Sequence, residues 1–380
     1  MRLKTKRPIR GFESKQDSQV TSDGSRNGGS QTPLVLGFVL ASLVLTAGLL
    51  FTVPNNLSPS DGGSNFFSRF GTWTTGTVGP TGTSTLILYS PLILNGSADV
   101  PYPADYDRMA TFALGLINKD RADFNLSSVQ QTSLNVAQQH ADSMLRYGYF
   151  SHWDTQGYKP YIRYSLLGGR GAVAENIAYA SVRPGHYSSA SDVEPVLRML
   201  ESSMMYNDSV CCNDGHRENI LNPLHTRVSI GIAYNYTTVF FAEDFENYYF
   251  DLAFSVDQSY AVSIGGSPVG GGSSPTEVLV TFDATPAAES PYELNTGPSE
   301  YDPGTVIGGV LPPCTLQCSR FIHGVTEYAT AWTFTPTQAA LVFSLSKFVE
   351  AKGAGVYTIY ILEGNDTGTA LTSISVFVKG

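Results

Sequence analysis

The sequence predicts an α+β protein with three parts: one transmembrane helix near the N-terminus, an α-β-α sandwich, and a C-terminal β-sandwich of immunoglobulin-like type. Three observations lead to this prediction. One run of twenty uncharged, mostly apolar residues begins at Leu34. Apolar residues then recur at helical spacing between residues 105 and 206, and two strand-like runs follow. Beyond residue 256, short strand-like runs alternate with turn-forming residues, which is typical of a β-sandwich.

The apolar run from Leu34 to Val53 is long enough to cross a membrane. At about 1.5 Å rise per residue, a helix of this length spans about 30 Å, which is the thickness of the hydrocarbon core. A cleaved signal peptide would have a shorter basic region, a shorter apolar core and a cleavage site, so we favour an uncleaved anchor over residues 33–53. Positive charges precede the run and none follows until Arg69, which predicts an N-terminus inside the cell and an ectodomain outside.

The segments beside the anchor differ in charge and composition. Residues 1–32 are polar and basic and are expected to form a disordered cytoplasmic tail. Residues 54–104 are rich in Gly, Ser, Thr and Pro and are expected to form a stalk. The tail has seven Lys/Arg and three Asp/Glu, so its net charge is +4. Because the whole chain has a net charge of −10, residues 33–380 have a net charge of −14. An acidic ectodomain argues against a nucleic-acid partner.

Glycosylation outside the cell fits the sequence, because it contains six N-x-S/T sequons. The sequons begin at Asn56, Asn95, Asn125, Asn207, Asn235 and Asn365.

The α-β-α half, residues 105–250, is predicted from helical and strand periodicity. A helix begins near Asp105, and Ser128 with Gln131 forms a capping box before a second helix. His140 lies on the second helix and is expected to be partly exposed. A third helix is expected over residues 190–206. Two antiparallel strands joined by a tight turn follow at 227–235 and 239–245.

The C-terminal part, residues 256–380, is expected to be a separate β-sandwich domain after a glycine-rich break at residues 265–275. It has no helical pattern and no catalytic motif. The expected strands include 278–282, 331–335, 341–345, 356–362 and 374–378.

Three short motifs in the α-β-α half each contain one side chain that can ligate a metal. These side chains are His152, Glu175 and His216. Apolar or aromatic residues accompany each of them. In chain order the motifs are YFSHWDTQG (149–157), AENIA (174–178) and DGHRENILNP (214–223), the last being read as a short helix capped by Asp214.

The ordered set of motifs resembles the CAP superfamily, which comprises cysteine-rich secretory proteins, antigen 5 and pathogenesis-related proteins and is also called the SCP domain. Bacterial and archaeal members share F-S-H-x-D-x-x-G, a downstream Arg, G-E-N-I-A, G-H-R-x-N-I-L and I-G-x-G. Here the Arg is Arg163, the last motif is Ile230-Gly231-Ile232, and Ala174 replaces the usual Gly. The resemblance covers roughly residues 105–250 and implies the same α-β-α sandwich.

The resemblance also implies a cleft with two histidines and two acids, which in several members binds zinc or another divalent metal. By position, His152 and His216 are the histidines and Glu175 is the first acid. The second acid position falls on Ser202, and the adjacent Glu201 would point about 100° away on a helix. Three ligands with an open fourth position are typical of a catalytic zinc site. Without a metal, the three side chains would form a hydrogen-bonded cluster that ties a loop to the sheet.

Four cysteines in an exported chain favour disulfides. Cys314 and Cys318 would close a plausible small loop, whereas a bond between the adjacent Cys211 and Cys212 is geometrically strained. A zinc site made from all four is disfavoured because neither pair has C-x2-C spacing.

Two functions fit these observations, and whether the protein is an enzyme is left open. The first is a cell-surface binding or interaction module whose cleft holds a small-molecule, lipid-like or peptide ligand. The second is a metal-assisted hydrolase, similar to a peptidase, that uses the same cleft. The sequence contains neither G-x-S-x-G nor H-E-x-x-H, so we favour the binding module.

Overall fold

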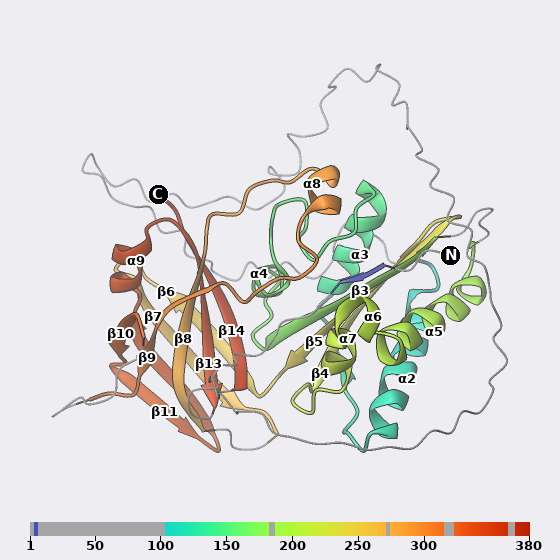
Figure 1. Ribbon diagram of the computed structural model, residues 1–380. Coiled ribbons are helices and arrows are strands. Elements are labelled where there is room, and N and C mark those ends of the chain that lie inside the picture. The colour runs from blue at the N-terminus through green and yellow to red at the C-terminus, as the bar shows by residue number, and fades with distance from the viewer. Residues whose placement is uncertain (1–3, 7–102, 182–186, 271–273, 315–322, 364–368) are drawn as a thin grey trace, which may run out of the picture. The chain divides into compact units, whose positions relative to one another are not determined.

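The computed structural model describes residues 4–6, 103–181, 187–270, 274–314, 323–363 and 369–380 (Figure 1). The expected transmembrane helix at residues 33–53 lies outside this range, as do nearly all of the tail and the stalk. Within the described segments, no helix is long and apolar enough to cross a membrane. The anchor therefore stays a prediction.

The first half is a sandwich built around one five-stranded sheet of strand order β1-β3-β5-β4-β2. The pairs within β3, β5 and β4 are antiparallel, and the short β2 runs parallel to β4. The predicted strand pair at 227–245 is confirmed as β4 and β5. The strands are β1 (Lys4–Lys6), β2 (Gln130–Gln131), β3 (Ala172–Ser181), β4 (Arg227–Tyr234) and β5 (Thr238–Asn247).

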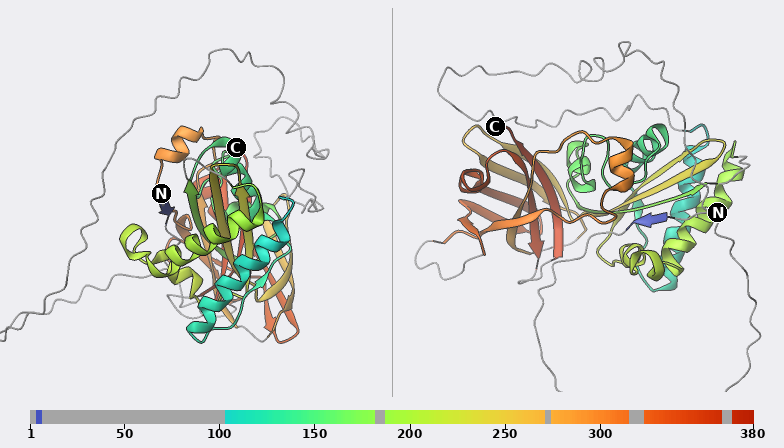
Figure 2. Two further views of the ribbon diagram at one scale, coloured as in Figure 1. Left: turned by 90° about the vertical axis from the view of Figure 1, so that its right-hand side faces the viewer. Right: turned by 45° about the horizontal axis from the view of Figure 1, so that its top comes forward.

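Helices cover both faces of this sheet. On one face α2 and α5 lie side by side, as Figure 2 shows, and their apolar residues form a core with β3, β4 and β5. On the other face α3 packs against β4 so closely that a Cβ at Gly231 would collide with the backbone of Ala137. The glycine of the I-G-I motif is therefore a packing requirement. The helices are α2 (Tyr106–Asp123), α3 (Val136–Tyr147), α4 (Pro160–Leu166), α5 (Ala190–Tyr206), α6 (Ser209–Cys212) and α7 (Gly215–Ile220).

Three local predictions in this half have clear outcomes. The helix over residues 190–206 is confirmed as α5, which begins with a capping box of Ser189 and Asp192. The capping box at Ser128 and Gln131 is wrong, because Gln131 belongs to β2 and the next helix begins only at Val136. The backbone of Gln131 pairs with β4 instead, so a tertiary contact overrides the local helix signal.

The short strand β1 bears on the expected topology. Lys4–Lys6 pair antiparallel with residues 177–179 at the outer edge of β3. This pairing puts the N-terminal residues on the same side of any membrane as the sheet. The predicted topology, with the N-terminus inside and the sheet outside, is incompatible with this pairing within one molecule.

The second half consists of two sheets that share one apolar core, as expected for a β-sandwich. Their strand orders are β10-β9-β8-β13-β14 and β11-β12-β7-β6. The glycine-rich stretch at 265–275 lies inside this sandwich, since residues 265–268 belong to β7 and residue 275 begins β8. Two short helices, α8 and α9, were not predicted. The elements are β6 (Phe250–Val256), β7 (Ala261–Pro268), β8 (Pro275–Asp283), α8 (Pro291–Thr296), β9 (Thr305–Leu311), β10 (Val325–Tyr328), β11 (Ala331–Thr335), β12 (Gln338–Ser344), α9 (Ser346–Lys352), β13 (Gly355–Glu363) and β14 (Thr369–Val378).

The two sandwiches share a further buried cluster. Tyr161 and Tyr164 on α4 pack in it with Tyr301 and Val356 from the second half. At its edge, Asp283 accepts hydrogen bonds from Lys159 Nζ at 2.8 Å and from the Tyr161 hydroxyl at 2.6 Å. The first sandwich therefore uses the second to complete part of its core.

We predict that residues 103–249 alone are less stable than residues 103–380 by at least about 3 kcal/mol. The reason is that each large apolar side chain of the shared cluster contributes about 1.5–3 kcal/mol when buried. Urea denaturation followed by tryptophan fluorescence measures the difference. Equal unfolding free energies would contradict a shared core and would support two independent domains.

Candidate functional site

The motif AENIA lies on β3, where adjacent side chains point to opposite faces of the sheet. Glu175 pairs in register with Asp244 on β5, and both point toward α3. Asn176 pairs with Glu243, and both point toward α5. The sheet therefore carries a buried polar cluster on each face.

The cluster on the α3 face, here called the His152 cluster, is centred on Glu175. Its Oε1 lies 2.8 Å from Nδ1 of His152, and its Oε2 accepts a hydrogen bond of 2.5 Å from Nη2 of Arg163. The other guanidinium nitrogen, Nη1, donates to the carbonyl oxygen of His152 at 2.6 Å. Arg163 thus fixes both the carboxylate and the loop that carries the histidine. The cluster consists of His140, His152, Arg163, Glu175, Asp244 and Tyr301.

His140 belongs to this cluster, so the expectation of a partly exposed histidine is wrong. Its side chain is buried, and its Nε2 donates to the carbonyl oxygen of Ser151 at 2.8 Å. Burial, and then the charge of Arg163, holds the pKa of His140 well below its ordinary value. His140 is therefore a neutral side chain that anchors the loop before His152.

Two carboxyls of this cluster compete for one cation. Burial raises the pKa of Glu175 to about 7, although Arg163 opposes the shift. Burial, and then the neighbouring Glu175, raises the pKa of Asp244 well above its ordinary value. Since one guanidinium faces both groups, one of the two carboxyls keeps a proton near neutral pH.

Tyr301 closes the His152 cluster from the second sandwich. Its hydroxyl accepts a hydrogen bond of 3.0 Å from the backbone N–H of Glu175, and its ring centroid lies 4.9 Å from that of His152. His152 and Glu175 are both 0% exposed. In this structure the cluster is consequently sealed from solvent.

The cluster on the α5 face, here called the His216 cluster, consists of Asp208, Cys212 and His216. Oδ1 of Asp208 lies 2.6 Å from Nδ1 of His216, and Oδ2 accepts the backbone N–H of His216 at 2.7 Å. Asp208 therefore both orients the ring and caps α7. The expected cap, Asp214, has no side-chain cap bond and adopts a left-handed conformation with φ of 62°.

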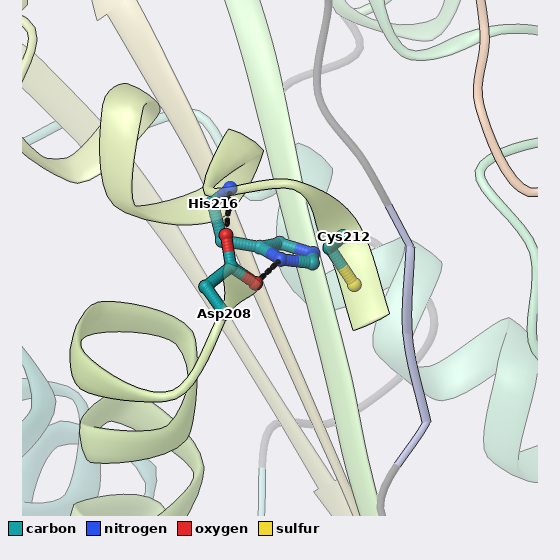
Figure 3. A group of neighbouring side chains, drawn as sticks. All are labelled: Asp208, Cys212 and His216. Atoms are coloured by element: carbon teal, nitrogen blue, oxygen red, sulfur yellow. Dashed lines mark hydrogen bonds and ion pairs between the residues drawn. The ribbon is translucent and has the colours of Figure 1, made fainter. Parts of the chain in front are cut away.

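The three residues of the His216 cluster each offer one ligand atom within 4.8 Å of the others, and all three are buried. Figure 3 shows the imidazole between the carboxylate and the cysteine. Geometry alone would let this group hold a metal ion. However, Cys212 is disulfide-bonded, and a disulfide sulfur is a poor ligand compared with a thiolate. The oxidised cluster therefore offers only the histidine and the aspartate as metal ligands.

A pair of buried acids lies on the same face. Asn176 Nδ2 donates to Oε2 of Glu243 at 3.2 Å and to the carbonyl oxygen of His216 at the same distance. Burial raises the pKa of Glu243 to about 7, and burial and then Glu243 raise the pKa of Glu201 well above its ordinary value. Both acids therefore bind protons more readily than exposed carboxyls do.

The expected fourth wall of the metal cleft needs a correction. Ser202 is exposed, whereas Glu201 is buried. Glu201 lies one turn from Leu197 and Met204 on the apolar stripe of α5, so helical phase directs it inward. Counting positions in the family pattern places Ser202 at the fourth wall, but such a count does not use the apolar stripe of the helix.

The expected three-ligand set divides between the two faces. His152 bonds to Glu175, while His216 bonds to Asp208. Among the residues that the structure describes, the group whose ligand atoms lie within 4.8 Å of one another contains His216 but not His152 or Glu175. The described geometry therefore does not fit one ion shared by all three.

Several residues of these clusters were missed or given no role by sequence reasoning. Arg163 could have been identified from the sequence, because it matches the Arg downstream of the first motif in the family pattern. Asp208 had none beyond lying eight residues before His216, and Tyr301 is 126 residues from Glu175.

The cysteines are oxidised as expected where the structure describes them. Cys212 and Cys314 are both in disulfides, and there is no free cysteine among the described residues. The side chain of Cys211 and the whole of Cys318 lie outside the described residues, and so do the pairings.

A comparison with solved structures finds three similar chains, one of which is described here. A crystal structure at 1.5 Å of an extracellular protein containing an SCP domain, from Bacillus anthracis str. Ames, is 22% identical with a TM-score of 0.28. The match covers 39% of this chain and 45% of that chain, which is less than half of either. No protein-family model matches the sequence, and no curated protein matches it.

We predict that Tyr301→Phe lowers the unfolding free energy by about 1 kcal/mol, because it removes one hydrogen-bond acceptor for the Glu175 N–H. Tyr301→Ala should lower it by about 3–5 kcal/mol, because it also empties the space over His152. Tyr292→Phe is the matched control, since Tyr292 is 77% exposed on α8. Chemical denaturation compares the three. A Tyr301→Phe protein as stable as the control would argue against the closure.

The buried acids predict a fold that is more stable at pH 5 than at pH 7.5. Burial raises the pKa of Asp142 to about 6, and the pKa values of Glu175 and Glu243 to about 7. Their unfolded pKa values are about 4–4.3. The folded state therefore holds extra protons between these limits, and this stabilisation is lost as the pH rises through about 7.

Buried histidines set the opposite limit. Burial lowers the pKa of His225 to about 3, and His140 is shifted in the same direction. Their contribution is present above the unfolded value of about 6.5 and is lost as the pH falls. Thermal denaturation across pH 4–8 tests the balance. Glu201→Gln, which mimics a protonated acid, should reduce the loss between pH 5 and 7.5, whereas the exposed Glu350→Gln should not. Stability that rises steadily to pH 8 would contradict the assignment.

Proposed function

We propose that the chain is a CAP-type protein that works as a binding module at the cell surface, with the described residues outside the cell. The three motifs support the CAP assignment, because they lie in chain order on the loop before α4, on β3 and on α7. The sequons also fit an extracellular location. Asn125, Asn207 and Asn235 are exposed among the described residues.

The observation that carries the choice of a binding module is the sealing of the His152 cluster. A hydrolytic centre has to bring substrate and water to its reacting groups. Here His152 and Glu175 are fully buried and lie beneath Tyr301. The three motif side chains also do not converge on one ion. The cluster therefore serves to hold the loop, the sheet and the second sandwich in one arrangement.

A surface for the ligand is offered by the outer side of the DGHRENILNP motif. While His216 points inward, exposed and half-buried residues of the same segment line a shallow pocket of about 540 Å³. Charged groups lie there beside apolar Leu221 and Pro223, which suits a short peptide with charged and apolar side chains. Arg217 also lies over the half-exposed Phe124, 4.9 Å from its ring centroid. The lining residues are Asp214, Arg217, Glu218, Leu221, Asn222 and Pro223.

The alternative function, a metal-assisted hydrolase, is favoured by one observation. Asp208 holds the imidazole of His216 in the way that a carboxylate orients a metal-bound or catalytic histidine. The full burial of His216 counts against substrate access in this structure.

We predict that the full ectodomain binds short peptides from a peptide array and that Glu218→Lys weakens this binding at least tenfold. Glu218 is exposed in the pocket, so reversing its charge changes the ligand surface without disturbing the core. Glu194→Lys is the matched control, because Glu194 lines a second shallow pocket between α2 and α5. Fluorescence anisotropy on the best array peptides measures affinity.

Either of two results would overturn the proposal. No binding to any peptide, or equal loss in both variants, would remove the pocket as the binding site. Zinc-dependent cleavage of the array peptides that disappears in His152→Ala or His216→Ala would establish the hydrolase instead.

A further inference from the structure

Only one of the two ring nitrogens of His216 has a hydrogen-bond partner among the described residues. Its Nδ1 is held by Asp208 at 2.6 Å, so in the neutral ring Nδ1 carries the proton and Nε2 presents a lone pair. Nε2 is buried and has no hydrogen-bond partner among the described residues. Most buried polar atoms are paired, so an unpaired one calls for an explanation.

The side of the ring away from Asp208 faces Cys212 (Figure 3). The sulfur belongs to the same group of ligand atoms within 4.8 Å, and Cys212 is 1% exposed. While the disulfide is intact, this sulfur neither donates a proton to Nε2 nor carries a charge. Reduction changes both properties at once.

We propose that reduction of the Cys212 disulfide creates a site for a thiophilic divalent cation such as Zn²⁺, ligated by Sγ of Cys212 and Nε2 of His216, with Asp208 orienting the imidazole. The disulfide then acts as a lock on the site. This inference does not depend on the peptide-binding role, because the pocket residues lie on the outer side of α7.

The ligand chemistry matches the cation. Zn²⁺ favours thiolate and imidazole ligands, and a histidine ligand usually gives its other N–H to a carboxylate. The thiolate and the Asp208 carboxylate carry two negative charges, which balance the charge of the ion in a buried site. The cation also provides a partner for the lone pair of Nε2.

Reduction of the disulfide needs a two-electron reductant, which is a phosphine in the test. A phosphine reacts with the disulfide and one water to give two thiols and the phosphine oxide. In a cell, a dithiol would give two thiols and its own disulfide by exchange. On metal binding, the Cys212 thiol releases its proton to solvent and forms the sulfur–metal bond.

The test uses the full-length chain in detergent and Co²⁺ as a spectroscopic substitute for Zn²⁺, with and without a phosphine reductant. A sulfur-to-cobalt charge-transfer band reports thiolate ligation directly. We expect one equivalent of this band after reduction and none before it. Zn²⁺ added afterwards should displace Co²⁺ and remove the band. This comparison needs only the wild-type protein, so it does not depend on whether any variant folds.

Variants then locate the site. Cys212→Ser and His216→Ala should each lose the band, and Asp208→Asn should weaken Co²⁺ binding by about 10–100-fold, as expected for a carboxylate that orients a ligand. The double variant Cys314→Ser/Cys318→Ser is the matched control and should keep the band. Circular dichroism checks the fold of each variant.

Three outcomes would overturn the inference. They are the absence of a band in the reduced wild type, a band of equal strength in the oxidised protein, and a band that survives Cys212→Ser but is lost in the Cys314/Cys318 variant.

Discussion

The carboxyl group of Glu175 imposes the strongest constraint on this structure, because it is an ionisable group with no access to solvent. An isolated buried carboxylate is very costly, so the fold has to supply compensating groups from several elements. Arg163 comes from α4, His152 from the preceding loop, and Tyr301 from the second sandwich. Removing one partner would leave the others uncompensated. The positions of α4, the loop and the link between the sandwiches are therefore tied to one side chain on β3.

The opposite face of the same strand follows a different solution. Burial raises the pKa values of Glu201 and Glu243, and Asn176 donates a hydrogen bond to Glu243. Two neighbouring residues of β3 thus belong to two networks, one paired with the Arg163 guanidinium and one made of acids that bind protons readily. The second network stabilises the fold most at mildly acidic pH.

Sequence reasoning was most successful where a signal is local. The helix over residues 190–206 has a strong periodic stripe and a capping box, and its bounds match α5. It failed where tertiary contacts decide. Gln131 joined a strand, and Glu201 turned inward although a count of positions had favoured Ser202. The partners of the motif side chains were the least predictable. Asp208 and Tyr301 belong to none of the three motifs, and only the fold brings them to His216 and Glu175.

The closure by Tyr301 has a consequence for the order of events during synthesis. The chain emerges from the N-terminus, so the whole first sandwich is available before residue 301 has been made. During that interval the backbone N–H of Glu175 lacks its acceptor, and one side of the His152 ring is uncovered. Consolidation of the first half therefore has to wait for the second. A chain of this design spends part of its synthesis with a polar centre open to water, and it depends on prompt completion to avoid misfolding.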